Sequence, residues 1–122
     1  MTTLIVNIEK QFEVLKKAGN TPSHSYEHAT RRAWALSASE AETVSSVIGL
    51  VKGQVHCIIV GCYAVRDEEM KERFQLVKGD VYTAVDFLLN SHDLMFKHLG
   101  STRGHRYGAS IQSVLDELNE KK

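Results

Sequence analysis

The chain has 122 residues, of which 43% are hydrophobic and 25% charged, a composition typical of one globular domain rather than two. Fifteen Lys and Arg residues balance fifteen Asp and Glu residues, so no global positive field draws the protein to DNA, RNA or an anionic membrane. No apolar run reaches the ~18 residues that span a bilayer, and the first residues lack the pattern of a secretory signal. We therefore expect a single domain, residues 1–122, that works in the cytoplasm without membrane contact.

The first segment carries an apolar stripe at helical spacing, at Leu4, Ile8, Phe12 and Leu15. This spacing predicts an amphipathic helix that ends at the turn signals between Gly19 and Pro22. The apolar side of the helix is broader than a short leading helix needs. Two placements therefore stay open: the helix covers a sheet in its own chain, or it packs on a second copy in an oligomer.

A second helix is predicted after an extended segment over residues 25–36, which mixes aromatic and β-branched residues with charge. Ser37 with Glu40, or Ser39 with Glu42, can form a capping box at the start of this helix. The buried stripe of the helix would consist of Ala38, Ala41, Val44, Val47, Ile48 and Val51. Gly53 marks its expected end.

Two strands joined by a charged turn are predicted next. The apolar run over residues 54–65 indicates a central strand covered on both faces, and residues 72–77 alternate as a second strand. Asp80 is expected to cap a helix whose apolar face is formed by Val81, Ala84, Val85, Leu88 and Leu89. A last helix would place on one side Ile111, Val114, Leu115 and Leu118. The expected fold is α+β: a small antiparallel sheet flanked by helices, with N-terminal and C-terminal amphipathic helices.

Metal-binding and catalytic patterns are sparse. Cys57 and Cys62 are five positions apart in one predicted strand, so they would point to opposite faces, and a disulfide between them is not expected. His24 and His28 would share one face of an extended segment, but no nearby carboxylate or Cys completes a metal site. His56 is too close to Cys57 in sequence for a catalytic pair. We therefore expect no metal, no cofactor and no catalytic activity.

Arginine and aromatic residues occur together in three places, and their chemistry matches a phosphorylated ligand that carries a base. Guanidinium groups hold phosphate oxygens, and aromatic rings stack on nucleobases. The candidate ligand-binding residues are Arg31, Trp34, Arg73, Phe74, Arg103, His105, Arg106 and Tyr107. The last four lie between Gly100 and Gly108, where glycines let backbone amides turn toward an anion. The expected phosphate ligands are Arg31, Arg103 and Arg106. Adenine is expected to stack on Trp34, Phe74 or Tyr107.

The stretch SYEHATRRAW, followed by VIGLVKGQVHCIIVGCYAV and ERFQLVKGDV, carries a resemblance over roughly residues 25 to 80. Its Tyr and Thr-Arg-x-x-Trp entry, its strand turn and its Arg-Phe strand resemble the small PUA-like or EVE-like modules found behind GIY-YIG-type nuclease domains. They also resemble the Thoeris anti-defence sponge proteins of phages. The chain departs from the module pattern at Arg32, where the modules commonly have Gly, and it lacks their Asn-Pro-x-x-Tyr-like ending.

The resemblance to the sponge proteins implies a protein that sequesters a cyclic ADP-ribose isomer or a cyclic oligonucleotide without converting it, so that a virus evades a bacterial defence. In that family the ligand is caged between subunits by aromatic and arginine residues, which implies a homo-oligomer, a dimer or a hexamer, in the host cytoplasm. Leu4, Ile8 and Phe12 would then belong to the interface.

The resemblance to PUA-like modules implies an alternative, a nucleic-acid-binding module that reads a modified base. The balanced net charge weakens this alternative, because binding along a nucleic-acid strand usually needs a basic stripe. The expected partner is therefore a small nucleotide signal, and no stable nucleic-acid partner is expected.

Overall fold

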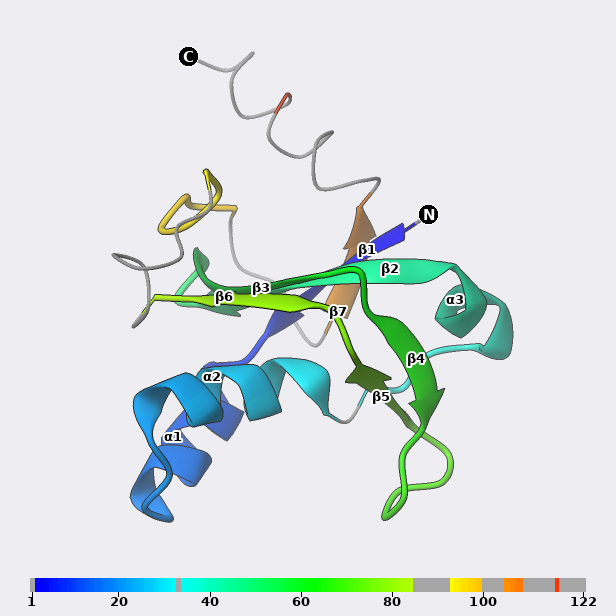
Figure 1. Ribbon diagram of the computed structural model, residues 1–122, viewed down its shortest axis with the longest axis horizontal. Coiled ribbons are helices and arrows are strands. Elements are labelled where there is room, and N and C mark those ends of the chain that lie inside the picture. The colour runs from blue at the N-terminus through cyan, green and yellow to red at the C-terminus, as the bar shows by residue number, and fades with distance from the viewer. Residues whose placement is uncertain (1, 33, 85–92, 100–104, 109–115, 117–122) are drawn as a thin grey trace.

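The computed structural model describes residues 2–32, 34–84, 93–99, 105–108 and 116. Its elements in chain order are β1 (Thr2–Asn7), α1 (Glu9–Lys17), α2 (Pro22–Arg31), α3 (Ala38–Thr43), β2 (Val44–Val51), β3 (Gln54–Val60), β4 (Tyr63–Arg66), β5 (Phe74–Val77), β6 (Asp80–Thr83) and β7 (His105–Gly108). Figure 1 shows α1 and α2 together on one side of the strands, and α3 at the end of the sheet near β4. No helix in these described ranges is long and apolar enough to cross a bilayer.

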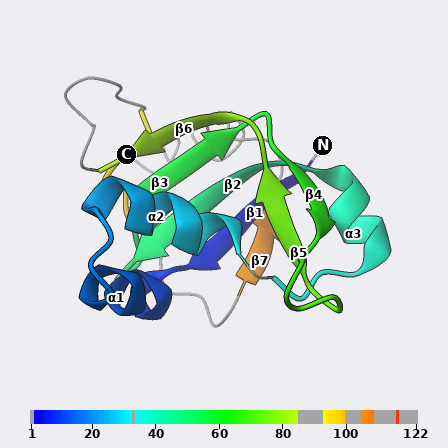
Figure 2. The same cartoon turned by 60° about the horizontal axis from the view of Figure 1, so that its bottom comes forward.

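Five strands form one sheet in the order β6–β3–β2–β1–β7, and β4 pairs with β5 in a separate two-stranded sheet. β1 and β2 run parallel, joined by a connection that contains α1, α2 and α3, whereas the other pairs are antiparallel. The α+β class is therefore confirmed, but the main sheet is mixed rather than antiparallel. Figure 2 shows the β4–β5 hairpin beside α3, at the end of the sheet away from α1.

Buried apolar side chains fill both faces of the main sheet. Leu4 and Val6 of β1 point to the face covered by the helices, where they pack in one cluster with Ala29 of α2. Ile5, which lies between them, points to the opposite face and packs with Leu94. Each fully buried aliphatic side chain stabilises the fold by about 1.5–3 kcal/mol. The central strands are thus the rigid base on which the hairpin and helices are placed.

The N-terminal segment is a strand followed by a helix, so the single helix predicted there is wrong over residues 2–7. The segment is rich in β-branched residues, which favour extended backbone, at Thr2, Thr3, Ile5 and Val6. Only the second half of the predicted stripe is helical, in α1, where Phe12 is buried and Leu15 packs against the core.

The apolar residues of this segment are covered within their own chain. Leu4 and Ile8 are fully buried, and Phe12 stacks on Tyr26 of α2 with 4.2 Å between ring centroids. Of the two placements open from the sequence, the structure shows packing inside the chain. These side chains are therefore not available for an interface between subunits.

Residues 22–31 form the helix α2, where an extended segment is predicted from the sequence. Thr21 is its N-cap, because its hydroxyl oxygen accepts a hydrogen bond of 3.3 Å from the amide of His24. Pro22 occupies the first helical position, where a missing N–H costs nothing. The preceding helix ends at Lys17 with Ala18 as its C-cap, and Thr21 and Pro22, predicted to be part of its end, begin a new helix.

The helix predicted to run as far as Gly53 ends at Thr43. Its start is confirmed: the Ser37 hydroxyl and the Glu40 carboxylate form the predicted capping box, with both hydrogen bonds at 3.2 Å. The rest of the predicted stripe lies in β2, where Val47 and Ile48 point to opposite faces of the sheet. The β-branched run after Thr43 therefore forms a strand.

The predicted hairpin is confirmed, and the long strand before it is divided. Gly61, with a φ of 80°, separates β3 from β4. Because of this break, Cys57 and Cys62 both belong to the helix-side cluster, so their predicted opposite orientation is wrong, and both thiols are free. The predicted helix from Asp80 is also wrong at residues 80–83, which form β6.

Other predictions fall on residues that the structure does not describe. The remainder of the helix predicted from Asp80, residues 85–89, lies outside the described residues. So does the C-terminal helix over residues 111–118, apart from Asp116. Of the predicted glycine loop, the described residues 105–108 form a strand, β7, paired with β1.

Candidate ligand-binding site

Arg31 connects the end of α2 to the β4–β5 hairpin by hydrogen bonds. Its Nη1 donates hydrogen bonds to the carbonyl oxygens of Leu76 at 3.2 Å and Lys78 at 2.9 Å. Its Nε donates to the carboxylate of Glu27 at 3.2 Å. The predicted phosphate ligand Arg31 is therefore engaged with groups of its own chain and positions the hairpin.

Arg32 forms a second connection between α2 and the loop that joins β4 to β5. Its Nε and Nη2 donate to the two carboxylate oxygens of Asp67 at 2.7 and 2.6 Å, and Nη2 also donates to Glu69 at 3.3 Å. The Asp67 side chain is fully buried and also accepts the backbone N–H groups of Glu69 and Met70. The Arg32 hydrogen bond, first among these contacts, holds the pKa of Asp67 far below its usual range.

Trp34 and Phe74, two predicted stacking residues, are brought together by the fold. The backbone N–H of each donates to the carbonyl oxygen of the other at 2.9 Å. The indole N–H of Trp34 donates to the carbonyl oxygen of Thr30 at 2.9 Å, so the ring is fixed against the end of α2. Trp34 thus positions Phe74, whose ring is almost completely buried.

Phe74 also lines a recess of about 250 Å³ between α3 and the hairpin. We call this the Arg66 recess; its other lining residues are Ala38, Ala41, Glu42, Ala64 and Arg66. The three elements that surround it, α3, β4 and β5, lie side by side in Figure 2. Because three of the lining side chains are alanines, a flat group can approach the walls closely.

Arg66 lies over the ring of Phe74 at this recess. The two residues are cross-strand neighbours in the β4–β5 register, and the guanidinium carbon is 4.5 Å from the ring centroid. Arg66 Nη1 also donates to the carbonyl oxygen of Lys71 at 3.3 Å. This arrangement holds a flat cation on an aromatic face, a surface on which a planar ligand group can stack.

The sequence pairs Phe74 with Arg73, but the structure pairs it with Arg66. Arg73 is exposed, and its backbone amide and carbonyl are bonded within the hairpin loop, to Met70 and Asp67. Sequence reasoning missed Arg66 because it considered neighbours along the chain. The signal that finds it is the hairpin itself, once its register is known, since cross-strand partners share a face.

The predicted glycine-loop residues are not joined to this recess by any described contact. His105, Arg106 and Tyr107 belong to β7, next to β1 in the main sheet. Arg103 lies outside the described residues. Their roles as ligand-binding residues therefore stay predictions.

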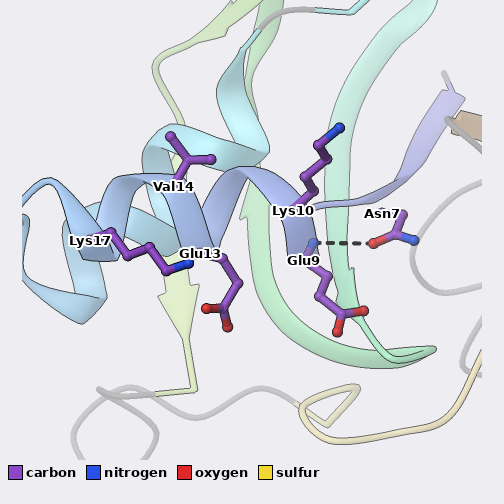
Figure 3. Close-up of a pocket in the computed structure, with 6 residues that line it drawn as sticks. All are labelled: Asn7, Glu9, Lys10, Glu13, Val14 and Lys17. Atoms are coloured by element: carbon purple, nitrogen blue, oxygen red, sulfur yellow. Dashed lines mark hydrogen bonds between the residues drawn. The ribbon is translucent and has the colours of Figure 1, made fainter.

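A second recess, of about 580 Å³, runs along α1. It is lined by Asn7, Glu9, Lys10, Glu13, Val14 and Lys17. Figure 3 shows that Glu9 and Glu13 point to the same side of α1, with the Glu9 amide bonded to the Asn7 side chain at 3.1 Å. Lys10 and Lys17 balance the two carboxylates, but none of the residues lining this recess is aromatic, so it offers no ring on which a base could stack.

A histidine and a tyrosine meet between α2 and β3, away from the Arg66 recess. His56 is the extra residue of a β-bulge opposite Gly49 and Leu50, and its Nδ1 is 3.3 Å from the hydroxyl of Tyr26. Burial lowers the pKa of His56 and raises that of Tyr26. Phe12 of α1 stacks on the same tyrosine, so Tyr26 contacts both α1 and β3.

The two cysteines have the properties of core residues. Burial raises the pKa of Cys57 to about 12 and that of Cys62 to about 11, so both are protonated at neutral pH. A thiol in this state is a poor nucleophile and a poor metal ligand.

Comparison with known proteins was negative: no protein-family model, no curated protein and no solved structure matches this chain. Function must therefore be inferred from the geometry of the chain's own residues.

Proposed function

We propose that the protein binds a small phosphorylated nucleotide at the Arg66 recess and releases it chemically unchanged. The observation that carries this proposal is the Arg66 guanidinium, held over the Phe74 ring beside a wall of alanines. A guanidinium supported by an aromatic ring offers its outer face to a base and its N–H groups to a phosphate. Arg66 can therefore contact both the base and the phosphate of one nucleotide.

Glu42 adds a preference for the kind of base. It is the acidic residue among those lining the recess, and its carboxylate can accept a hydrogen bond from an exocyclic amine. Adenine, cytosine and guanine present such an amine, whereas uracil and thymine do not. Among the three, the resemblance to the sponge proteins favours adenine, and the proposed ligand is a cyclic ADP-ribose isomer or a cyclic oligonucleotide used as a signal by a bacterial defence.

The volume of the Arg66 recess bears on the oligomeric state of the protein. At about 250 Å³ it is smaller than the roughly 300–1,000 Å³ of pockets that enclose a whole small ligand. It fits one ring system and leaves the rest of a nucleotide exposed. Since tight binding requires most of the ligand surface to be covered, we propose that a second copy completes the cage in a homo-oligomer, a dimer or a hexamer. The assembled homo-oligomer would act in the host cytoplasm.

Binding energies permit capture without chemistry. Stacking contributes about 1–3 kcal/mol per base, and each charge-assisted hydrogen bond about 1.5–3 kcal/mol. A few such contacts reach the roughly 8 kcal/mol that corresponds to micromolar affinity, and closure by a second copy adds to them. Sequestration of a signal requires tight binding and no bond breaking.

Native mass spectrometry of the full chain with cyclic ADP-ribose isomers and cyclic adenine dinucleotides tests the proposal. We expect an oligomer that carries intact ligand, and recovery of ligand of unchanged mass after heat denaturation. Recovery of cleaved products would overturn the non-catalytic function. Binding to oligonucleotides that strengthens with their length and weakens steeply with salt would instead favour the nucleic-acid-binding alternative.

A further inference from the structure

The loop between β4 and β5 supplies the hydrogen-bond acceptor that directs Arg66. Arg66 Nη1 donates to the carbonyl oxygen of Lys71 at 3.3 Å. Lys71 lies in a turn that is closed by a hydrogen bond of 2.8 Å from the Arg73 N–H to the Met70 carbonyl oxygen. A surface arginine has many rotamers, and the bond to this turn favours the one in which the guanidinium lies over the Phe74 ring, 4.5 Å from its centroid. The position of the turn therefore sets the position of Arg66.

The carboxylate of Asp67 fixes that turn. The Asp67 side chain is fully buried, and its Oδ1 accepts the backbone N–H groups of Glu69 at 2.9 Å and Met70 at 3.0 Å. The Asp67 N–H donates to the carbonyl oxygen of Arg73 at 2.9 Å. An aspartate that accepts backbone N–H groups two and three positions on holds a tight loop. Asp67 is thus bonded to both residues between which the turn is closed.

Arg32 in turn connects the carboxylate to the end of α2. Its Nε and Nη2 donate to the two oxygens of Asp67 at 2.7 and 2.6 Å, and such a bidentate pair fixes orientation as well as distance. The ring under Arg66 is held from the same end of α2, because the Trp34 indole donates to the Thr30 carbonyl oxygen and the Trp34 backbone is bonded to that of Phe74. The cation and the ring are therefore both placed relative to one helix end.

We propose that Asp67 is a positioning residue for ligand binding at the Arg66 recess, an inference that rests on the proposed function. Held by Arg32, its carboxylate fixes the loop whose Lys71 carbonyl keeps Arg66 over the ring. Asp67 is not among the described residues that line the recess, so it acts through Arg66 rather than on the ligand. Its negative charge alone would oppose an anionic ligand. Loss of that charge should strengthen binding if Asp67 acted by charge, and weaken it if Asp67 acts by position.

Isothermal titration of cyclic di-AMP into the full chain separates these two effects. Asp67→Asn opposes an N–H₂ group to the donors of Arg32 and is expected to weaken binding by roughly fivefold or more, without exceeding the loss in Arg66→Ala. The matched control Glu69→Gln removes a charge from the same loop at a side chain that is 77% exposed, and it should bind at least as tightly as the wild-type chain. Affinity in Asp67→Asn equal to that in Glu69→Gln would overturn the positioning role.

A double-variant cycle distinguishes positioning from a general loss of stability. Because Asp67 acts through Arg66, Asp67→Asn should not weaken binding further in the Arg66→Ala background. An equal loss in both backgrounds would overturn the proposal. If Asp67→Asn fails to fold, Arg32→Lys takes its place in the cycle, because lysine keeps the charge but lacks the fork that holds the carboxylate.

A ligand-free measurement keeps this inference separate from the proposed function. The ring current of Phe74 moves the NMR signals of Arg66 side-chain protons upfield while the guanidinium lies over the ring. We expect this shift in the wild-type chain and in Glu69→Gln, and its loss in Asp67→Asn. An unchanged shift in Asp67→Asn would overturn the positioning role. Failure of the wild-type chain to bind cyclic adenine nucleotides would instead overturn the proposed function, and the NMR shift would still decide whether Asp67 positions Arg66.

Discussion

Two regions of the molecule use arginine in opposite ways. At the junction of α2 with the hairpin, Arg31 and Arg32 bond to carbonyl oxygens and to a buried carboxylate of the same chain. At the Arg66 recess, the arginine rests on an aromatic ring and is exposed. Arg31 and Arg32 therefore hold the fold together, whereas Arg66, which has an aromatic ring and one exposed carbonyl oxygen as partners, lies at the surface where the proposed ligand would bind.

The largest expected effect is at the junction. Asp67→Asn keeps the shape of the side chain but removes the charge that pairs with Arg32, and breaking one partner of a buried pair costs about 3–5 kcal/mol. We expect the free energy of unfolding, measured by urea denaturation, to fall by about 3 kcal/mol. Because Arg32 is partly exposed, water recovers some of the loss. A loss below ~1 kcal/mol would show that the junction does not hold the fold.

The next largest loss of stability is expected where α2 packs against the sheet, at Gly49 of β2. A Cβ at Gly49 would lie 2.5 Å from the hydroxyl oxygen of Thr30 and 3.0 Å from Ile8 Cδ1. Gly49→Ala is therefore expected to lower the free energy of unfolding by about 1–3 kcal/mol, as overpacking does. Thr30→Ser, which keeps the hydroxyl, should not relieve this loss, whereas Thr30→Ala should recover part of it in the double variant. If Gly49→Ala lowered the free energy of unfolding equally in the Thr30→Ser and Thr30→Ala backgrounds, the close approach would be contradicted.

The loss of folding stability at low pH should come from histidines between the helices and the main sheet, rather than from the Arg66 recess. The pKa of His56 lies below its ordinary value of 6.5 because of burial, so below pH 6.5 the unfolded chain binds a proton that the folded chain does not. Stability is then full above pH 6.5 and falls as the pH drops toward the folded pKa. His28 acts in the same direction. Urea titrations between pH 8 and pH 5 should show a shallower fall in His56→Gln, and a slope unchanged by both His56→Gln and His28→Gln would refute this origin.

Arg66 should have the smallest effect on stability. An exposed cation–π contact is worth about 0.5–1 kcal/mol, so Arg66→Ala is expected to lower the free energy of unfolding by no more than ~1 kcal/mol in the same urea assay. A loss as large as that of Asp67→Asn would place Arg66 with the structural arginines and remove the contrast between the two regions.

Local signals predicted the start of α3 and the β4–β5 hairpin well and residues 2–31 poorly. The capping box at Ser37 and the hairpin around the charged turn depend on short-range contacts, and both are present. The strand β1 was missed because Leu4 and Ile8 match helical spacing across the boundary between a strand and a helix. The helix α2 was missed because Thr21 and Pro22 were interpreted as the end of one helix when they also begin another.

The candidate site was predicted by residue type rather than by geometry. Arginine next to aromatic residues drew attention to Trp34 and Phe74, which the fold brings together, and their role as stacking residues stays a prediction. The partner of Phe74 depends on the hairpin register, which the sequence alone does not determine, so Arg66 was missed. The structural role of Arg31 depends on carbonyl oxygens 45 or more positions away, and no pattern along the chain shows such contacts.

Isothermal titration of a cyclic adenine nucleotide into matched variants tests the central claim most directly. Arg66→Ala and Arg66→Lys should both weaken binding by about tenfold or more, because alanine removes the stacking plane with its charge and lysine keeps only the charge. Lys16→Ala, which removes an exposed cation on α1, should bind as the wild-type chain does. Equal affinity in Arg66→Ala and the wild-type chain, or equal losses in Arg66→Ala and Lys16→Ala, would contradict binding at this recess.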